Sequence, residues 1–121
     1  MINTENDNLL FLQSLENKNY TLVNNLLKNG IPDLNYHKTD DFQKSQHSSY
    51  LNKVKYHIRE LFLEGEFYAA QKILSKFNIK RKQNQGEATI TKDDLASIAD
   101  YLIQKKSNNI HFFWDKFFKT E

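Results

Sequence analysis

Hydrophobic side chains recur at intervals of three and four residues along most of this chain. This spacing gathers them on one face of an α-helix, which repeats every 3.6 residues. The pattern predicts helices over residues 4–17, 21–29, 49–64 and 66–77, a fifth helix that begins after Thr91, and a sixth that begins at Ser107 or Asn108. The predicted buried positions are Leu9, Phe11, Leu12 and Leu15 in the first helix, Leu22, Val23, Leu26 and Leu27 in the second, Leu51, Val54, Ile58, Leu61 and Phe62 in the third, Phe67, Ala70, Ile73, Leu74 and Phe77 in the fourth, and Leu95, Ile98, Ala99, Leu102 and Ile103 in the fifth.

Local signals mark the ends of several of these helices. Thr21 is expected to cap the second helix, because a threonine hydroxyl can accept a hydrogen bond from the first turn. Gly30 suits a left-handed position after that helix, and Pro32 prevents the helix from continuing. The clearest start belongs to the fifth helix, where Thr91 and Asp94 form a predicted capping box.

Two polar segments, residues 32–47 and 78–90, lack the helical spacing and are predicted to be long loops. The helices between them are expected to pair as hairpins, and three aligned sets of residues support internal repetition. Tyr20, Val23 and Leu27 align with Phe67, Ala70 and Leu74 at an offset of 47 residues, and with Ile110, Phe113 and Phe117 at an offset of 90. We therefore predict a single all-α domain over residues 1–121, built from five to six helices packed as degenerate helical-hairpin repeats.

The composition fits a folded chain and removes several classes of function. Leu, Ile, Phe and Val supply 34 of the 121 residues, and the net charge is only +2, which is unlike a disordered chain. Without cysteine, the chain can form neither a disulfide nor a thiolate metal site. No segment approaches the ~20 apolar residues of a membrane-spanning helix, and the polar N-terminus lacks the basic region of a signal peptide, so a cytoplasmic protein is expected.

Two short segments resemble known repeat families. Residues 16–35, ENKNYTLVNNLLKNGIPDLN, resemble the second helix and following loop of an ankyrin repeat, and the likeness includes Val23, Leu26, Leu27, Gly30, Asp33 and Asn35. Residues 65–70, GEFYAA, are similar to the inter-helix turn of a tetratricopeptide repeat at Gly65, Phe67 and Ala70. These resemblances imply a stack of helical hairpins that acts as a protein-binding module.

A small, cysteine-free, helical chain without a catalytic motif also resembles bacterial immunity proteins, which neutralise a cognate toxin by covering its active site. That resemblance implies a non-catalytic protein that binds a toxin domain, such as a nuclease, without a cofactor. Gathered at one end of the hairpin stack, acidic side chains would attract a basic partner, but ordinary surface charge is the favoured interpretation of Asp40, Asp41, Glu60, Glu64 and Glu66. The predicted partner-binding residues are Tyr36, Asp40, Asp41, Glu64, Glu66 and Tyr68.

The main alternative is a nucleic-acid-binding regulator that uses a basic segment. Its phosphate contacts would come from Lys72, Lys76, Lys80, Arg81 and Lys82. Arginine is the usual bidentate reader of guanine, and the chain has only two arginines, so sequence-specific DNA recognition is disfavoured.

A third hypothesis is that the chain is a ribonuclease in which His37 or His57 acts as the general base. No spacing around either histidine is diagnostic of that chemistry. His57 and Glu60 are three residues apart, as in some helical metal sites, but no second such pair accompanies them, so an ion pair on the helix surface is favoured. We therefore expect neither catalysis nor a bound metal.

The C-terminal segment IHFFWDKFF is the densest aromatic stretch in the chain. Ile110, Phe113, Trp114 and Phe117 share one helical face, which predicts packing against the fifth helix. Phe112 and Phe118 lie off that face, and exposed aromatic side chains are common anchors of protein interfaces. A partner surface or a homodimer through this helix is the alternative to core packing alone.

Overall fold

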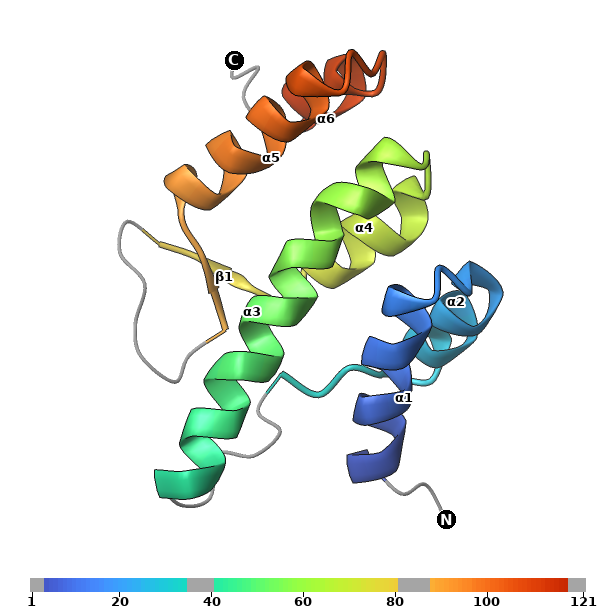
Figure 1. The fold of residues 1–121 in the computed structure, drawn as a ribbon, viewed down its shortest axis with the longest axis vertical. Helices are drawn as coiled ribbons and strands as arrows, with labels where there is room; N and C mark the ends of the chain where they lie inside the picture. The colour runs from blue at the N-terminus through green and yellow to red at the C-terminus, as the bar shows by residue number, and fades with distance from the viewer. Residues whose placement is uncertain (1–3, 35–40, 81–87, 118–121) are drawn as a thin grey trace.

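A computed structural model describes residues 4–34, 41–80 and 88–117 of the chain, without the side chains of residues 4–6 and 41–49. The described residues form six helices and one pair of two-residue strands (Figure 1). In chain order these are α1 (Thr4–Glu16), α2 (Tyr20–Lys28), α3 (Asp41–Leu63), α4 (Phe67–Leu74), β1 (Asn78–Ile79), β2 (Thr89–Ile90), α5 (Lys92–Gln104) and α6 (Ile110–Phe117). The predicted all-α fold is confirmed.

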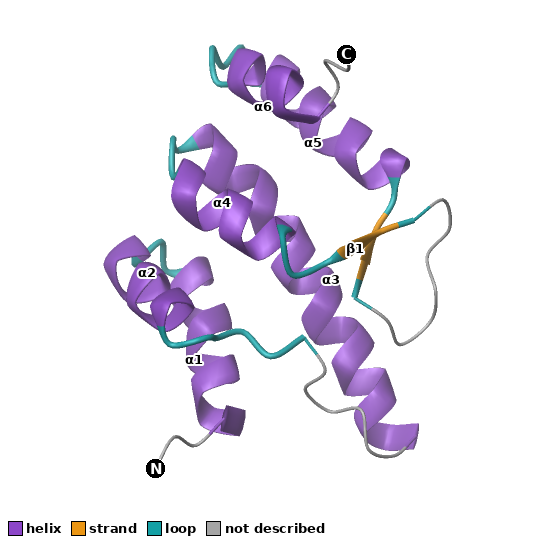
Figure 2. Ribbon diagram, turned by 180° about the vertical axis from the view of Figure 1, so that it is seen from behind, coloured by secondary structure: helices purple, strands orange, loops and turns teal. Residues whose placement is uncertain are grey.

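The helices form three hairpins that stack side by side, α1–α2, α3–α4 and α5–α6 (Figures 1 and 2). Helix α3 lies in the middle of the stack, because it packs against α1 on one side and α5 on the other. Helix α2 packs against α4 in the second layer. Each hairpin buries its apolar face against a neighbour, which a single hairpin cannot do alone.

The three hairpin turns share one backbone conformation and hydrogen-bond pattern. Lys18, Gly65 and Lys106 follow the first helix of each hairpin and adopt left-handed conformations, with φ of 57°, 79° and 55°. In each turn this residue donates a hydrogen bond to a carbonyl three residues back, and the next residue donates to a carbonyl five residues back. This is the Schellman pattern, which satisfies the last carbonyl groups of a helix.

The second helices of the hairpins begin at equivalent residues. Helices α2, α4 and α6 start at Tyr20, Phe67 and Ile110, the first members of the three sets aligned in the sequence. The second members, Val23, Ala70 and Phe113, are all fully buried. The aligned positions therefore occupy corresponding places in the three hairpins.

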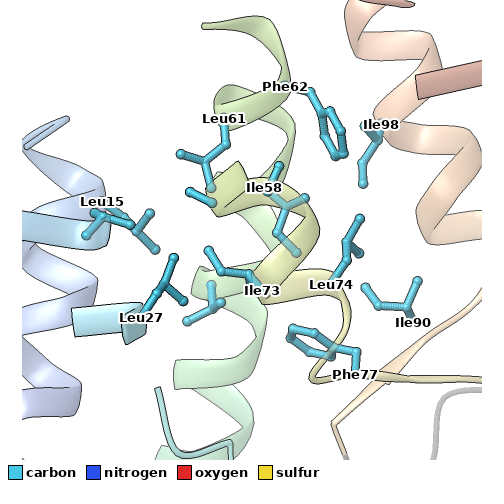
Figure 3. Close-up of a cluster of buried hydrophobic side chains, with 14 of the residues drawn as sticks. Leu15, Leu27, Ile58, Leu61, Phe62, Ile73, Leu74, Phe77, Ile90 and Ile98 are labelled. Atoms are coloured by element: carbon cyan, nitrogen blue, oxygen red, sulfur yellow. The ribbon is translucent and has the colours of Figure 1, made fainter. Parts of the chain in front are cut away.

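A continuous hydrophobic core runs through the stack, with contributions from all three hairpins (Figure 3). Figure 3 shows Ile58, Leu61 and Ile73 between the first hairpin and the third. The aromatic part of the core centres on Phe62, whose ring meets that of Phe113 edge-on at 4.9 Å between centroids. Such edge-to-face pairs add to the stabilisation that burial of the rings provides.

Three predicted core positions are wrong. Leu9, Ile103 and Trp114 are exposed by 45%, 57% and 49%. In α1 the buried positions are 8, 11, 12, 14 and 15, so the polar Asn8 takes the place predicted for Leu9. The side-chain oxygen of Asn8 accepts a hydrogen bond from the backbone N–H of Asp33 at 2.7 Å, and its Nδ2 atom is buried without a partner among the described residues.

The aromatic helix α6 also departs from the prediction at Phe112. Its ring stacks on that of Phe67 at 4.1 Å between centroids and is half-buried, so Phe112 is not an exposed anchor. Phe113 and Phe117 pack near Phe62 as expected. Phe118 lies outside the described residues, and dimerisation through this helix stays a prediction.

The predicted loops and some helix ends need correction. Helix α3 begins at Asp41 instead of Ser49, which shortens the loop that was expected over residues 32–47. Residues 41–49 are mostly polar, so they carry no periodic signal, and a helix can extend into them from its packed half. Asn19, not Thr21, caps α2, since its side chain accepts from the N–H of Leu22. The capping box of Thr91 and Asp94 is confirmed.

Helix α4 ends at Leu74, before the predicted Phe77, and the segment after it contains strand β1. Strands β1 and β2 pair in parallel, with Ile79 opposite Ile90. Two residues are too few for a sequence pattern, and the paired residues are eleven positions apart in the chain, so the local sequence did not predict the pairing. Among the described residues, no helix combines the length and the apolar character needed to cross a membrane.

Candidate functional site

An apolar groove of about 590 Å³ opens between α4, the strand pair, α5 and α6. Its floor and walls are formed by Leu74, Phe77, Ile79, Ile90, Leu95 and Phe117. This volume falls within the range of pockets that hold small molecules or the side chains of a partner. We refer to this hollow as the groove.

The local sequence explains how the helices and strands position the residues that line the groove. Leu74 ends α4, and Phe77 follows in the turn that leads into β1. The parallel pairing of β1 with β2 then sets Ile79 beside Ile90. The capping box fixes the start of α5 directly after β2, and so positions Leu95 one turn later. Figure 3 shows Leu74, Phe77 and Ile90 converging on one side of the core.

Ile79 is the most exposed large apolar side chain at this site, with 65% of its surface accessible. Tyr68 stands at the rim and is 51% exposed. Isolated exposed apolar residues are ordinary, but these two border a hollow that is already lined by apolar side chains. Within the described part of the chain, the groove therefore offers exposed apolar surface to a binding partner.

The rim of the groove carries positive charge. Lys72 and Lys116 line it, and no aspartate or glutamate lines it in the described part of the chain. Both lysines lie in the last turns of their helices, where the helix dipole favours a cation. The groove is therefore suited to apolar groups that are flanked by negative charge.

The predicted partner-binding acids do not gather at one end of the stack. Asp41 begins α3 and Glu64 follows its end, and the 23 residues of α3 span about 34 Å. Glu64 instead forms an ion pair with Lys18, at 3.0 Å between Nζ and Oε2. Glu66 is the N-cap residue of α4, close to Glu64 in the same turn. Tyr36 and Asp40 lie outside the described residues.

The Lys18–Glu64 pair joins the turns of the first two hairpins. Its hydrogen bond and its charge raise the pKa of Lys18. Tyr20 lies nearby, and its pKa is raised mainly by burial and then by the Glu64 carboxylate. Both lysine and carboxylate remain largely exposed, so the pair is screened by solvent and adds little to stability.

The predicted basic segment is only partly brought together. Lys72 borders the groove, whereas the ammonium group of Lys76 donates to the carbonyl oxygen of Gly30 at 3.3 Å. Lys80 is exposed directly after β1, and Arg81 and Lys82 lie outside the described residues. The neighbouring rings of Phe67 and Phe77 are packed into the protein, which leaves Tyr68 as the aromatic residue nearby that is open to a nucleic-acid base.

His57 lies on α3, and its Nδ1 is 2.8 Å from Oε1 of Glu60. Both side chains are mostly buried, and the ring of Tyr56 meets the imidazole edge-on. Among the residues that the structure describes, no group of three or more histidine, aspartate or glutamate side chains gathers as metal ligands would. His37 lies outside the described residues.

Sequence reasoning missed Ile79, Phe117 and Lys116 as groove residues. Ile79 lies in the segment 78–90, which the sequence predicts to be a loop, and only its pairing with β2 brings it to the groove. Phe117 was predicted to pack on the fifth helix, and its ring lies at the edge of the groove, 6.1 Å from that of Phe62 on α3. The chain matches no family model, no curated protein and no solved structure. The ankyrin-like, tetratricopeptide-like and immunity-protein resemblances therefore stay predictions.

Proposed function

We propose that this chain is a non-catalytic protein-binding module that docks a partner protein in the groove between α4, α5 and α6. The observation that carries the proposal is an apolar hollow with an exposed isoleucine and tyrosine and a rim of two lysines. Interfaces of this kind draw most of their affinity from a few large apolar or aromatic anchors that fill a pocket.

The chemistry of the groove specifies the partner segment. It presents two or more large apolar side chains at the groove floor and carries aspartate or glutamate beside them, facing Lys72 and Lys116. Burial of apolar area supplies the affinity, at roughly 25 cal/mol per Å² before the costs of association. The opposite charges at the rim orient the partner and speed its approach.

The finer proposal is that the partner is a toxin domain, such as a nuclease, and that the chain is its immunity protein. This rests on the small, cysteine-free, helical character of the chain. An immunity protein binds in a one-to-one complex and abolishes toxicity when the two proteins are produced together. Tyr68 would then contact the toxin at the rim of the groove, and Glu64 and Glu66 would contact it from the turn before α4.

The test compares two exposed isoleucines. Ile79→Asp introduces a charge at the groove, and Ile103→Asp introduces the same charge at a similarly exposed position outside it. Each tagged full-length chain is used to capture partners from nuclease-treated native extract, and the bound proteins are quantified by mass spectrometry. We expect one stoichiometric partner that is lost with Ile79→Asp and retained with Ile103→Asp.

Two results would contradict the proposal. Equal capture by both variants would exclude the groove as the docking surface. Disappearance of the partners after nuclease treatment, with binding that weakens steeply as salt rises, would favour the nucleic-acid alternative through Lys72, Lys76 and Lys80. A captured toxin domain whose activity is blocked by the wild-type chain, and not by Ile79→Asp, would support the immunity role.

A further inference from the structure

Arg59, on α3, contacts the rings of two tyrosines. The carbon at the centre of its guanidinium group lies 3.9 Å from the ring centroid of Tyr56 and 4.4 Å from that of Tyr101, on α5. These two cation–π contacts restrict the rotation of the Arg59 side chain. An anion would bind at the edge of the guanidinium, which carries its N–H donors.

One donor of Arg59 is left without a partner. Its Nε atom is buried and has no hydrogen-bond partner, and the guanidinium forms no ion pair within the described part of the chain. The side chain as a whole is half-buried. A buried donor without a partner costs free energy, and a bound ion is one way to satisfy it.

A cavity of about 180 Å³ lies beside Arg59, between α3 and α5. Lys55, Tyr56, Asp94 and Ser97 line it together with Arg59. It is separate from the groove, although Ile90 contributes to the wall of each. Its volume is below that of pockets for drug-sized molecules, so it suits one small polar group.

The described charges around the cavity, those of Lys55, Arg59 and Asp94, sum to a net positive site. Lys55 donates to Oδ2 of Asp94 at 3.1 Å and to the carbonyl oxygen of Thr89 at 3.0 Å. The same carboxylate oxygen accepts from the backbone N–H of Thr91, so Asp94 is already neutralised by its own partners. Glu60, one residue from Arg59, is paired with His57. Among the residues that the structure describes, no nearby carboxylate is therefore left to neutralise Arg59.

We propose that Arg59 and this cavity bind an oxyanion, the group shared by phosphate monoesters and carboxylates. The guanidinium edge would donate to two oxygens of the anion in the bidentate geometry that arginine favours. The Ser97 hydroxyl at the cavity wall would donate to a third oxygen. This site is independent of the groove, so it stands or falls without the proposed protein partner.

The test is an NMR titration of the ¹⁵N-labelled full chain with inorganic phosphate and, separately, with acetate, at ionic strength held constant with sodium chloride. We expect saturable shifts of the Arg59 side-chain resonances and of the Ser97 amide. Saturation with phosphate identifies a phosphate site, saturation with acetate alone identifies a carboxylate site, and either result supports the oxyanion proposal.

Two variants and one control locate the binding. Arg59→Gln removes the charged guanidinium and its paired N–H donors. It is expected to weaken anion binding by about tenfold or more, which is the scale of a charged hydrogen bond. Lys53→Gln removes an exposed cation from the same helix, outside the cavity, and is expected to leave the dissociation constant within about twofold. Ser97→Glu adds an anion at the cavity wall and is expected to abolish binding without disturbing the core, because Ser97 is exposed.

The variants also define the overturning results. The proposal is overturned by shifts that do not saturate with either anion, or by equal weakening of anion binding in Arg59→Gln and Lys53→Gln. Arg59 would then only stabilise the packing of α3 against α5. Should Arg59→Gln fail to fold, as judged by circular dichroism, Ser97→Glu decides the matter: unchanged binding in that variant overturns the proposal.

Discussion

Two hairpin turns place a lysine in a left-handed backbone conformation, which costs more free energy for lysine than for glycine. Gly65 occupies its left-handed position freely, because it has no Cβ to meet the following carbonyl. Lys18 and Lys106 occupy the corresponding positions of the other two hairpins with side chains that disfavour this conformation. A Cβ at Gly65 would meet only Nδ2 of Asn109, at an ordinary 4.0 Å, so the difference between the turns is one of backbone conformation and not of crowding.

Lys106→Gly is therefore expected to raise the free energy of unfolding by about 0.5–1 kcal/mol. Gly65→Ala is expected to lower it by about 1 kcal/mol for the same reason. Urea denaturation of each variant measures both changes. The matched control is Lys105→Gly, at a right-handed position with φ of −81°, where glycine brings no relief and is expected to destabilise. A gain in Lys105→Gly equal to that in Lys106→Gly would contradict the conformational explanation.

At the scale of the element, the start of α5 combines three local contacts. The Thr91 hydroxyl accepts from the N–H of Asp94, and the Asp94 carboxylate accepts from the N–H of Thr91 and from Lys55 of α3. Burial by itself would raise the pKa of Asp94, but the hydrogen bonds and the charge of Lys55 outweigh it, so the pKa is lowered below its usual 3.8. The capping box therefore also fastens the third hairpin to α3.

The lowered pKa of Asp94 gives a pH dependence of definite sign. A carboxyl group whose pKa is lower in the folded state stabilises the fold above its unfolded pKa, and that contribution is lost as the pH falls through the folded pKa. Asp94→Asn is therefore expected to be less stable than the wild type at pH 7, with the difference shrinking below pH 3.8. Urea denaturation at a series of pH values measures the gap, and a gap that is constant with pH would contradict this role.

The whole molecule is held together across hairpins by buried polar contacts as well as by the apolar core. The Tyr50 hydroxyl on α3 donates to the backbone carbonyl of Asn8 on α1, at 2.8 Å, in a fully buried setting. The Asn8 side chain in turn accepts from the backbone of Asp33, beyond α2. One polar residue therefore connects the first hairpin, its outgoing segment and the central helix.

Tyr50→Phe removes the hydroxyl from this network and is expected to lower the free energy of unfolding by about 1 kcal/mol. Because the hydroxyl connects the first hairpin to α3, amide exchange is expected to accelerate more in α1 and α2 than in α5. The control, Tyr101→Phe, removes a hydroxyl from a half-exposed ring on the far hairpin. Uniform acceleration throughout the chain in Tyr50→Phe would argue against a local connection.

The sequence by itself determined the helices and most of their buried faces. The apolar stripes around Val23, Ile58 and Leu102 repeat at helical spacing, and a stripe must be buried wherever the helix lies. The capping box at Thr91 and the stop after Gly30 were also readable, because capping depends on residues within one turn of each other. Tyr68 is exposed at the rim of the groove, and its role in partner binding stays a prediction.

Only the tertiary structure decided which side chains meet across elements. The groove depends on a pairing between Ile79 and Ile90, and the oxyanion cavity depends on Arg59 of α3 facing Tyr101 of α5. These contacts join residues that are distant in the chain, and their partners are chosen by the stacking of hairpins and not by local periodicity. The same reason explains why Asn8 is buried and Leu9 is exposed. Asn8 accepts hydrogen bonds from Tyr50 of α3 and from Asp33, and these distant partners leave no signal in the local sequence.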